Sequence, residues 1–137
     1  MNTWVKRRLF HAKASAKGGK RADLGNVFFR SRWEANYARA LNAMKARGDI
    51  VDWFYEDREF AFKGIKRGTR FYKPDFRIVT KDREYFVEVK GHLDSKSVTA
   101  LARMAKYYPD VLVLLLDKYR YAEIESEFGN LEGWERA

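Results

Sequence analysis

Residues 72–91, YKPDFRIVTKDREYFVEVKG, form the stretch that decides the fold. Two apolar runs flank the polar segment TKDR, and this pattern predicts a β-hairpin. Side chains alternate between the two faces of a strand. We therefore expect Phe86, Glu88 and Lys90 on one face of the second strand. On the first strand, Asp75 takes one face, and the other face takes Tyr72, Pro74, Phe76 and Ile78.

A turn centred on Lys81 and Asp82 fixes the pairing of these two strands. It places Asp75 opposite Glu88 and Lys73 opposite Lys90, although like charges facing each other destabilise a sheet. Two such carboxylates need a cation, and hard oxygen ligands suit Mg²⁺, with Mn²⁺ as a substitute. Beside this cation, Lys90 is suited to orient or deprotonate a water, or to stabilise charge on a phosphorus. The alternative is a charged edge hairpin that only prevents aggregation.

The charge balance favours a nucleic-acid partner. The 137 residues include 28 Lys and Arg against 19 Asp and Glu, a formal net charge of +9, and such an excess suggests a polyanion. Residues 1–24 have the composition of a flexible basic arm; the alternative is a tail without a binding role. The arm residues expected to contact DNA are Lys6, Arg7, Arg8, Lys13, Lys17, Lys20 and Arg21.

The remaining pattern predicts one α/β domain over residues 25–137. A helix begins after Ser31, strands and the hairpin follow, a second helix begins after residue 94, and VLVLLL at 111–116 predicts a central strand parallel to the hairpin's last strand. The order is α-β-β-β-α-β, a mixed β-sheet flanked by helices. Two further sites are suited to phosphate, although a solvated turn and a simple helix cap explain them equally: Lys66, Arg67 and Arg70 in a basic loop, and Ser95 and Lys96 at the second helix's N-terminus.

The sequence also limits the class of protein. It has no cysteine, so disulfides and Cys-based zinc sites are excluded. The longest apolar run is too short to span a bilayer, and the basic N-terminus lacks the apolar stretch of a signal peptide. We expect a soluble, cytoplasmic protein without membrane contact.

At its charged hairpin the chain resembles the PD-(D/E)xK nuclease superfamily. The motif consists of Pro74-Asp75, Glu88, Val89 and Lys90. Its context, FRSRWE at 29–34 and KYYPDVLVLL at 106–115, resembles the phage junction-resolving endonuclease I family and related phage endonucleases. The resemblance covers roughly residues 29–116.

This resemblance implies a restriction-endonuclease-like core and a divalent-metal-dependent endodeoxyribonuclease. It implies that Asp75, Glu88 and the Val89 carbonyl bind metal, that Lys90 is catalytic, and that Glu34 completes a second metal site. It further implies a homodimer that cuts branched DNA such as Holliday junctions, in the host cytoplasm if the protein is phage-encoded.

Other interpretations remain open at this stage. Glu34 also fits a capping box with Ser31. The whole chain also fits a strand-cutting subunit of a transposition or restriction system, or a non-catalytic basic module that binds nucleic acid.

Overall fold

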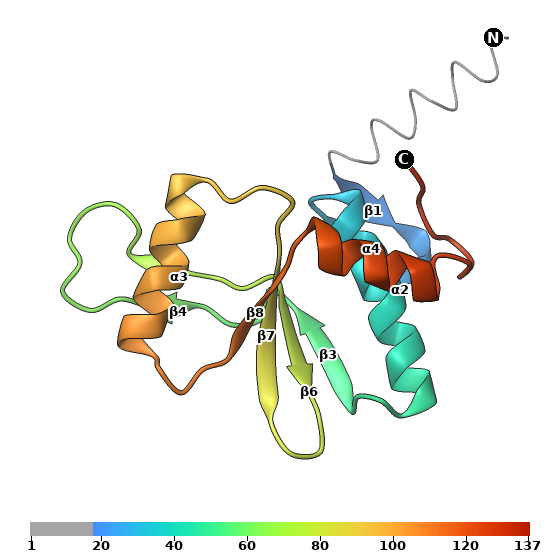
Figure 1. Cartoon of the computed structure of the whole chain (residues 1–137), viewed down its shortest axis with the longest axis horizontal. Helices are drawn as coiled ribbons and strands as arrows, with labels where there is room; N and C mark the ends of the chain where they lie inside the picture. The colour runs from blue at the N-terminus through green and yellow to red at the C-terminus, as the bar shows by residue number, and fades with distance from the viewer. Residues whose placement is uncertain (1–17) are drawn as a thin grey trace, which may run out of the picture. The chain divides into compact units, whose positions relative to one another are not determined.

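The computed structural model describes residues 18–137 (Figure 1). They divide into two compact units: Lys45–Arg120 forms one, and the chain up to Met44 together with Tyr121–Ala137 forms the other. The expectation of one domain over 25–137 stays a prediction. The expected arm contacts Lys6, Arg7, Arg8, Lys13 and Lys17 lie outside the described residues. Among those described, none of the helices is long and apolar enough to cross a membrane.

The first unit begins with a short hairpin. Strand β1 (Gly19–Arg21) pairs antiparallel with β2 (Val27–Phe29), and the 3₁₀ helix η1 (Ala22–Leu24) lies between them. Gly25 and Asn26 adopt the left-handed conformation that lets the chain reverse here. Residues 19–24, expected in the flexible arm, therefore belong to regular structure.

Helix α2 (Arg32–Arg47) has the boundaries that its sequence predicts. The Ser31 hydroxyl accepts a hydrogen bond from the Glu34 amide at 3.1 Å, as expected of an N-cap. At the other end Gly48 has a positive φ of 82° and closes the last turn. Ala35, Ala38 and Leu41 are fully buried. Tyr121 of α4 (Lys118–Phe128) stacks on Trp33 with ring centroids 4.2 Å apart.

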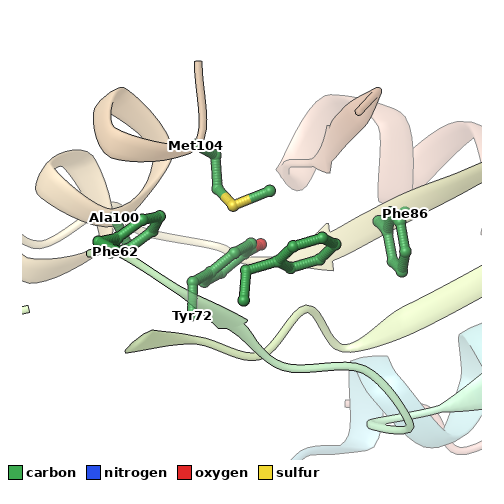
Figure 2. Close-up of a cluster of buried hydrophobic side chains, with 6 residues drawn as sticks. Phe62, Tyr72, Phe86, Ala100 and Met104 are labelled. Atoms are coloured by element: carbon green, nitrogen blue, oxygen red, sulfur yellow. The ribbon is translucent and has the colours of Figure 1, made fainter. Parts of the chain in front are cut away.

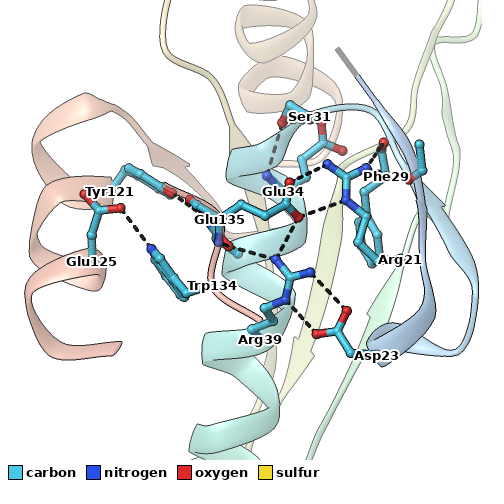
Figure 3. A network of polar contacts seen from close by, with 12 residues as sticks. Arg21, Asp23, Phe29, Ser31, Glu34, Arg39, Tyr121, Glu125, Trp134 and Glu135 are labelled. Atoms are coloured by element: carbon cyan, nitrogen blue, oxygen red, sulfur yellow. Dashed lines mark hydrogen bonds and ion pairs between the residues drawn. The ribbon is translucent and has the colours of Figure 1, made fainter. Parts of the chain in front are cut away.

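A network of charged side chains ties the C-terminal segment to α2 and β1 (Figure 3). Glu135 accepts from Arg39 at 2.8 Å and from Arg21 at 2.9 Å, and Arg39 also donates to Asp23 at 2.8 Å. Arg21 and Arg39 are each only 7% exposed. Arg21, expected to contact DNA from the arm, is instead buried because its charge is neutralised by Glu135.

The network depresses the pKa values of its acids. The hydrogen bond from Arg39 lowers the pKa of Asp23. Burial opposes ionisation of Glu135, but hydrogen bonds from Arg21 and Arg39 outweigh it and lower the pKa of that carboxyl too. A carboxyl with a depressed folded-state pKa stabilises the fold above its unfolded pKa, near 4, and loses this contribution as the pH falls.

We predict that Glu135→Ala lowers the free energy of unfolding at pH 7 by about 3 kcal/mol, since it leaves two buried guanidinium groups without their shared partner. The difference from wild type should shrink as the pH falls below about 4, because the carboxyl of the unfolded chain then binds a proton before that of the folded protein does. Urea denaturation at pH 7 and pH 3 measures both effects. Glu132→Ala, an exposed neighbour, is the control and should change neither value.

The second unit contains a four-stranded mixed sheet of order β3-β6-β7-β8. Strands β3 (Asp52–Tyr55), β6 (Phe76–Val79) and β7 (Glu84–Val89) pair antiparallel in turn, and β8 (Val113–Leu116) pairs parallel with β7 through α3 (Ser95–Tyr107). The chain thus runs α2, β3, β6, β7, α3, β8, which confirms the expected α-β-β-β-α-β order. The two-stranded ribbon of β4 (Phe60–Ala61) and β5 (Phe71–Tyr72) is inserted between β3 and β6.

Strand β8 is parallel to β7 as predicted, but the prediction that it is central is wrong. Among the described strands β8 has one neighbour, β7, and so forms an edge of the sheet. Val113, Leu114 and Leu115 are only partly buried. An apolar run predicts that the two faces of a strand are shielded from water. It does not predict whether the strand has a neighbour at each of its edges.

The second unit's core lies between α3, the β4–β5 ribbon and β7 (Figure 2). Ala100 and Met104 of α3 pack against Phe62, Tyr72 and Phe86. Asp94 caps α3 by accepting from the Ser97 amide at 2.8 Å. This core holds the ribbon and strand β7 together, and the candidate site lies at their junction.

Candidate functional site

The β6–β7 hairpin has the predicted register. Phe76 pairs with Val87, and the pairing continues to Val79 with Glu84. The Thr80 amide donates to the Arg83 carbonyl at 2.8 Å, so the turn is centred on residues 81 and 82. Continued by one position beyond the last ladder pair, this register would set Asp75 opposite Glu88.

The first strand of the hairpin is shorter than the sequence suggests. Strand β6 begins only at Phe76. The residues before it turn away from β7, and β5 pairs with β4 instead. The expectation that Lys73 lies opposite Lys90 is therefore wrong. Pro74, which has no amide N–H, stands at the bend, where the chain leaves one ladder for another.

Asp75 is held at this bend by two hydrogen bonds. Its Oδ2 accepts from the Val89 amide at 2.8 Å, and its carbonyl accepts from the Glu56 amide at 2.8 Å. Glu56 has a positive φ of 51°, an unfavourable conformation for a residue with a side chain. Asp75 is only 2% exposed. The carboxylate thus lies against β7, beside Glu88, in a place where burying a charge requires strong compensation.

Glu88 is held by a residue that sequence reasoning did not select. The Tyr72 hydroxyl donates to Glu88 Oε2 at 2.5 Å. Burial raises the pKa of Tyr72 well above its ordinary value, and the negative charges of Glu88 and then Asp75 raise it further. Both carboxylates therefore act on one phenol. Tyr72 was expected on the opposite face from Asp75, and the bend at Lys73 and Pro74 is what turns it toward Glu88.

Lys90 follows the last residue of β7, and its amide donates to the Leu116 carbonyl at 3.1 Å. Its side chain is one-third exposed, with Nζ 4.0 Å from Asp94 Oδ2. Continued by one residue beyond β7, the strand alternation predicts that Lys90 shares a face with Glu88. The structure joins Asp75 to Val89 and Tyr72 to Glu88 by hydrogen bonds, and it places the Lys90 ammonium beside Asp94.

The N-terminus of α3 differs from the expected phosphate site. Asp94 occupies it with a carboxylate, and the hydrogen bond from the Ser97 amide lowers the pKa of Asp94. A phosphate there would meet this negative charge, which weakens the case for Ser95 and Lys96 as a phosphate-binding pair. Both residues are exposed.

Glu34 belongs to the first unit and is 5% exposed. The Ser31 hydroxyl donates to its Oε2 at 3.1 Å while accepting from its amide. The capping interpretation is thus confirmed, with the Ser31 hydroxyl bound to both the amide and the carboxylate of Glu34. Its role as a metal ligand stays a prediction.

The predicted basic loop forms the tip of the β4–β5 ribbon. Lys66, Arg67 and Arg70 are exposed there, and the Arg103 guanidinium of α3 donates to the Thr69 carbonyl and holds the loop to the helix. Lys20, on β1 of the first unit, is also exposed.

The donor set fits a hard divalent cation. Asp75 and Glu88 both act electrostatically on the Tyr72 hydroxyl, and carboxylate oxygens are ligands that suit Mg²⁺ or Mn²⁺. Within residues 18–137, no three or more His, Cys, Asp and Glu side chains are grouped so that they could hold a metal ion. A cation bound by two carboxylates fits Mg²⁺, which keeps several waters and accepts substrate oxygens.

Comparison with known proteins gives no assignment. No family model matches the chain, and no curated protein or solved structure matches it.

We predict that Tyr72→Phe lowers the free energy of unfolding by about 1–2 kcal/mol at pH 7, because the half-buried Glu88 loses a donor while the ring packing remains. The raised folded-state pKa of Tyr72 means that its hydroxyl stabilises the fold fully below the ordinary value of 10.0 and loses this contribution at higher pH. Tyr72→Phe should therefore reduce the loss of stability between pH 9 and pH 11.

Denaturant unfolding at pH 7, pH 9 and pH 11 measures both effects. Tyr119→Phe is the matched control, because Tyr119 is 70% exposed. Equal stability of Tyr72→Phe and wild type at pH 7 and at pH 9 would contradict the role assigned to this hydroxyl.

Proposed function

We propose that this protein is a divalent-metal-dependent endodeoxyribonuclease with a PD-(D/E)xK-type site in a restriction-endonuclease-like core. The observation that carries the proposal is the position of Asp75. Its carboxylate leaves the strand ladder and binds the backbone of β7 at Val89, next to Glu88 and one residue before Lys90. A hairpin built only for stability has no use for two acids at this position.

Each residue has a distinct part in the proposed reaction. Asp75 and Glu88 would hold the cation, with the Val89 carbonyl as a further ligand. When bound, a Mg²⁺ ion polarises the phosphodiester and lowers the pKa of a coordinated water. The Lys90 ammonium would orient the attacking water or stabilise charge on the phosphorus. Glu34 is proposed as the ligand of a second cation.

Branched DNA is the proposed substrate, with a four-way junction as the leading example. The net charge of +9 supports salt-sensitive binding to phosphates. The chain has no base-reading motif, which favours recognition of shape over sequence. We propose a homodimer as the active form, since symmetric cutting of a junction requires two active sites at a fixed separation.

The proposal predicts cleavage of a labelled four-way junction by the purified protein with Mg²⁺ or Mn²⁺, and none with EDTA. Asp75→Asn should reduce the rate at least about a hundredfold, because it removes a charged ligand, and Lys90→Ala by a similar factor. Both variants should bind the junction in EDTA as tightly as wild type. Gel analysis of the products, with a linear duplex in parallel, gives the rates.

Matched controls lie in the turn of the same hairpin, where Asp82→Asn and Lys81→Ala alter exposed residues. These should cut at the wild-type rate, and thermal melts should show all four variants folded. Binding without cleavage under every divalent metal tried would reject the nuclease and leave a basic binding module. Cleavage that appears only after a partner protein is added would favour a subunit of a transposition or restriction system.

A further inference from the structure

The β4–β5 ribbon has two faces of opposite character. Phe60, Phe62 and Tyr72 point into the core beneath α3, and each is at most 8% exposed (Figure 2). The residues between them point outward, and Phe71 is 52% exposed. Fold stability explains the inner aromatics, whereas the outer one loses most of the benefit of burial.

The exposed ring of Phe71 lies beside one cation, in a segment rich in basic residues. Residues 60–74 contain five basic side chains and no acid. The Arg70 guanidinium lies 5.7 Å from the centre of the Phe71 ring. Lys73 follows Phe71 by two residues in the chain, and Lys63 follows Ala61, the strand partner of Phe71, by two residues; both lysines are exposed.

This surface is directly connected to the candidate site. Phe71 and Tyr72 are consecutive residues of β5 with opposite orientations, and Tyr72 donates to Glu88. The inner anchor is firm, because Tyr72 is 8% exposed and packs in the α3 cluster. A ligand bound to Phe71 on the outer face therefore contacts the residue next in sequence to Tyr72, whose hydroxyl donates to the proposed metal ligand Glu88.

We propose that Phe71 stacks on an unpaired base of branched or single-stranded DNA, while Arg70, Lys63 and Lys73 bind the adjoining phosphates. This inference rests on the proposed function and names the feature of the substrate that the site recognises. An aromatic ring among cations matches a single-stranded nucleic acid, which offers both a base face and a charged backbone. An intact duplex keeps its bases stacked on each other and offers Phe71 only the phosphates.

Equilibrium binding in EDTA tests the inference apart from catalysis. The ligands are a four-way junction and a single strand, each with 2-aminopurine at the branch point or centre, and a linear duplex of the same composition. Phe71→Ala should weaken binding to the junction and the single strand about tenfold and leave duplex affinity unchanged. It should also abolish the quenching of 2-aminopurine, and Phe71→Trp should restore both.

Two sets of controls separate stacking from charge. Tyr119→Ala removes another exposed aromatic ring with a lysine beside it, 5.1 Å from Lys118 Nζ, and should change nothing. Lys63→Ala and Lys73→Ala should each weaken binding to all three ligands alike. Each should also reduce the slope of log affinity against log salt concentration by about the value of one phosphate contact.

The outcomes distinguish this inference from the proposed function. Equal binding by Phe71→Ala and wild type, or an equal loss on duplex and junction, overturns the stacking role while the nuclease proposal stands. A wild-type protein that binds none of the three ligands overturns both.

Discussion

The hydrogen bond from the Val89 amide to Asp75 Oδ2 is the interaction on which the second unit's arrangement depends. Beyond Phe76, where the β6–β7 ladder ends, the Val89 amide is bound by the Asp75 side chain instead of by a backbone carbonyl of β6. Buried backbone N–H groups need a partner, and here the partner is a carboxylate at 2% exposure. A neutral residue of similar size would also satisfy the amide, so the hydrogen bond alone does not account for a charged residue at this position.

The bend at Pro74 and Asp75 also determines what surrounds the site. It releases β5 from the hairpin, so that the strand pairs with β4 and its alternate residues meet α3. Tyr72 is thereby turned toward Glu88, and Phe71 is turned away from the core. One change of direction therefore produces the fixed carboxylate, its phenol partner and an outward aromatic ring among basic residues.

Much of this arrangement follows from the sequence, and the misses have physical causes. The hairpin register is specified because a shift of one residue would exchange the buried and exposed sides of both strands. The α2 caps follow from Ser31 and Gly48, which have local roles. The loss of Lys73 from the ladder and the partnership of Tyr72 with Glu88 depend on β4, a strand that lies ten residues earlier in the chain. Local alternation carries no information about that choice of partner.

Arg21 shows the same limit for charges. Composition places it in a basic arm, but its partner Glu135 lies 114 residues away in the chain, and only the folded unit brings them together. Net charge therefore overstates the number of cations available to a polyanion. By contrast, the cations of the ribbon are exposed at a loop tip. Since exposed charges lose little by being unpaired in water while buried ones must be neutralised, the ribbon's cations, rather than Arg21, can attract a negatively charged ligand.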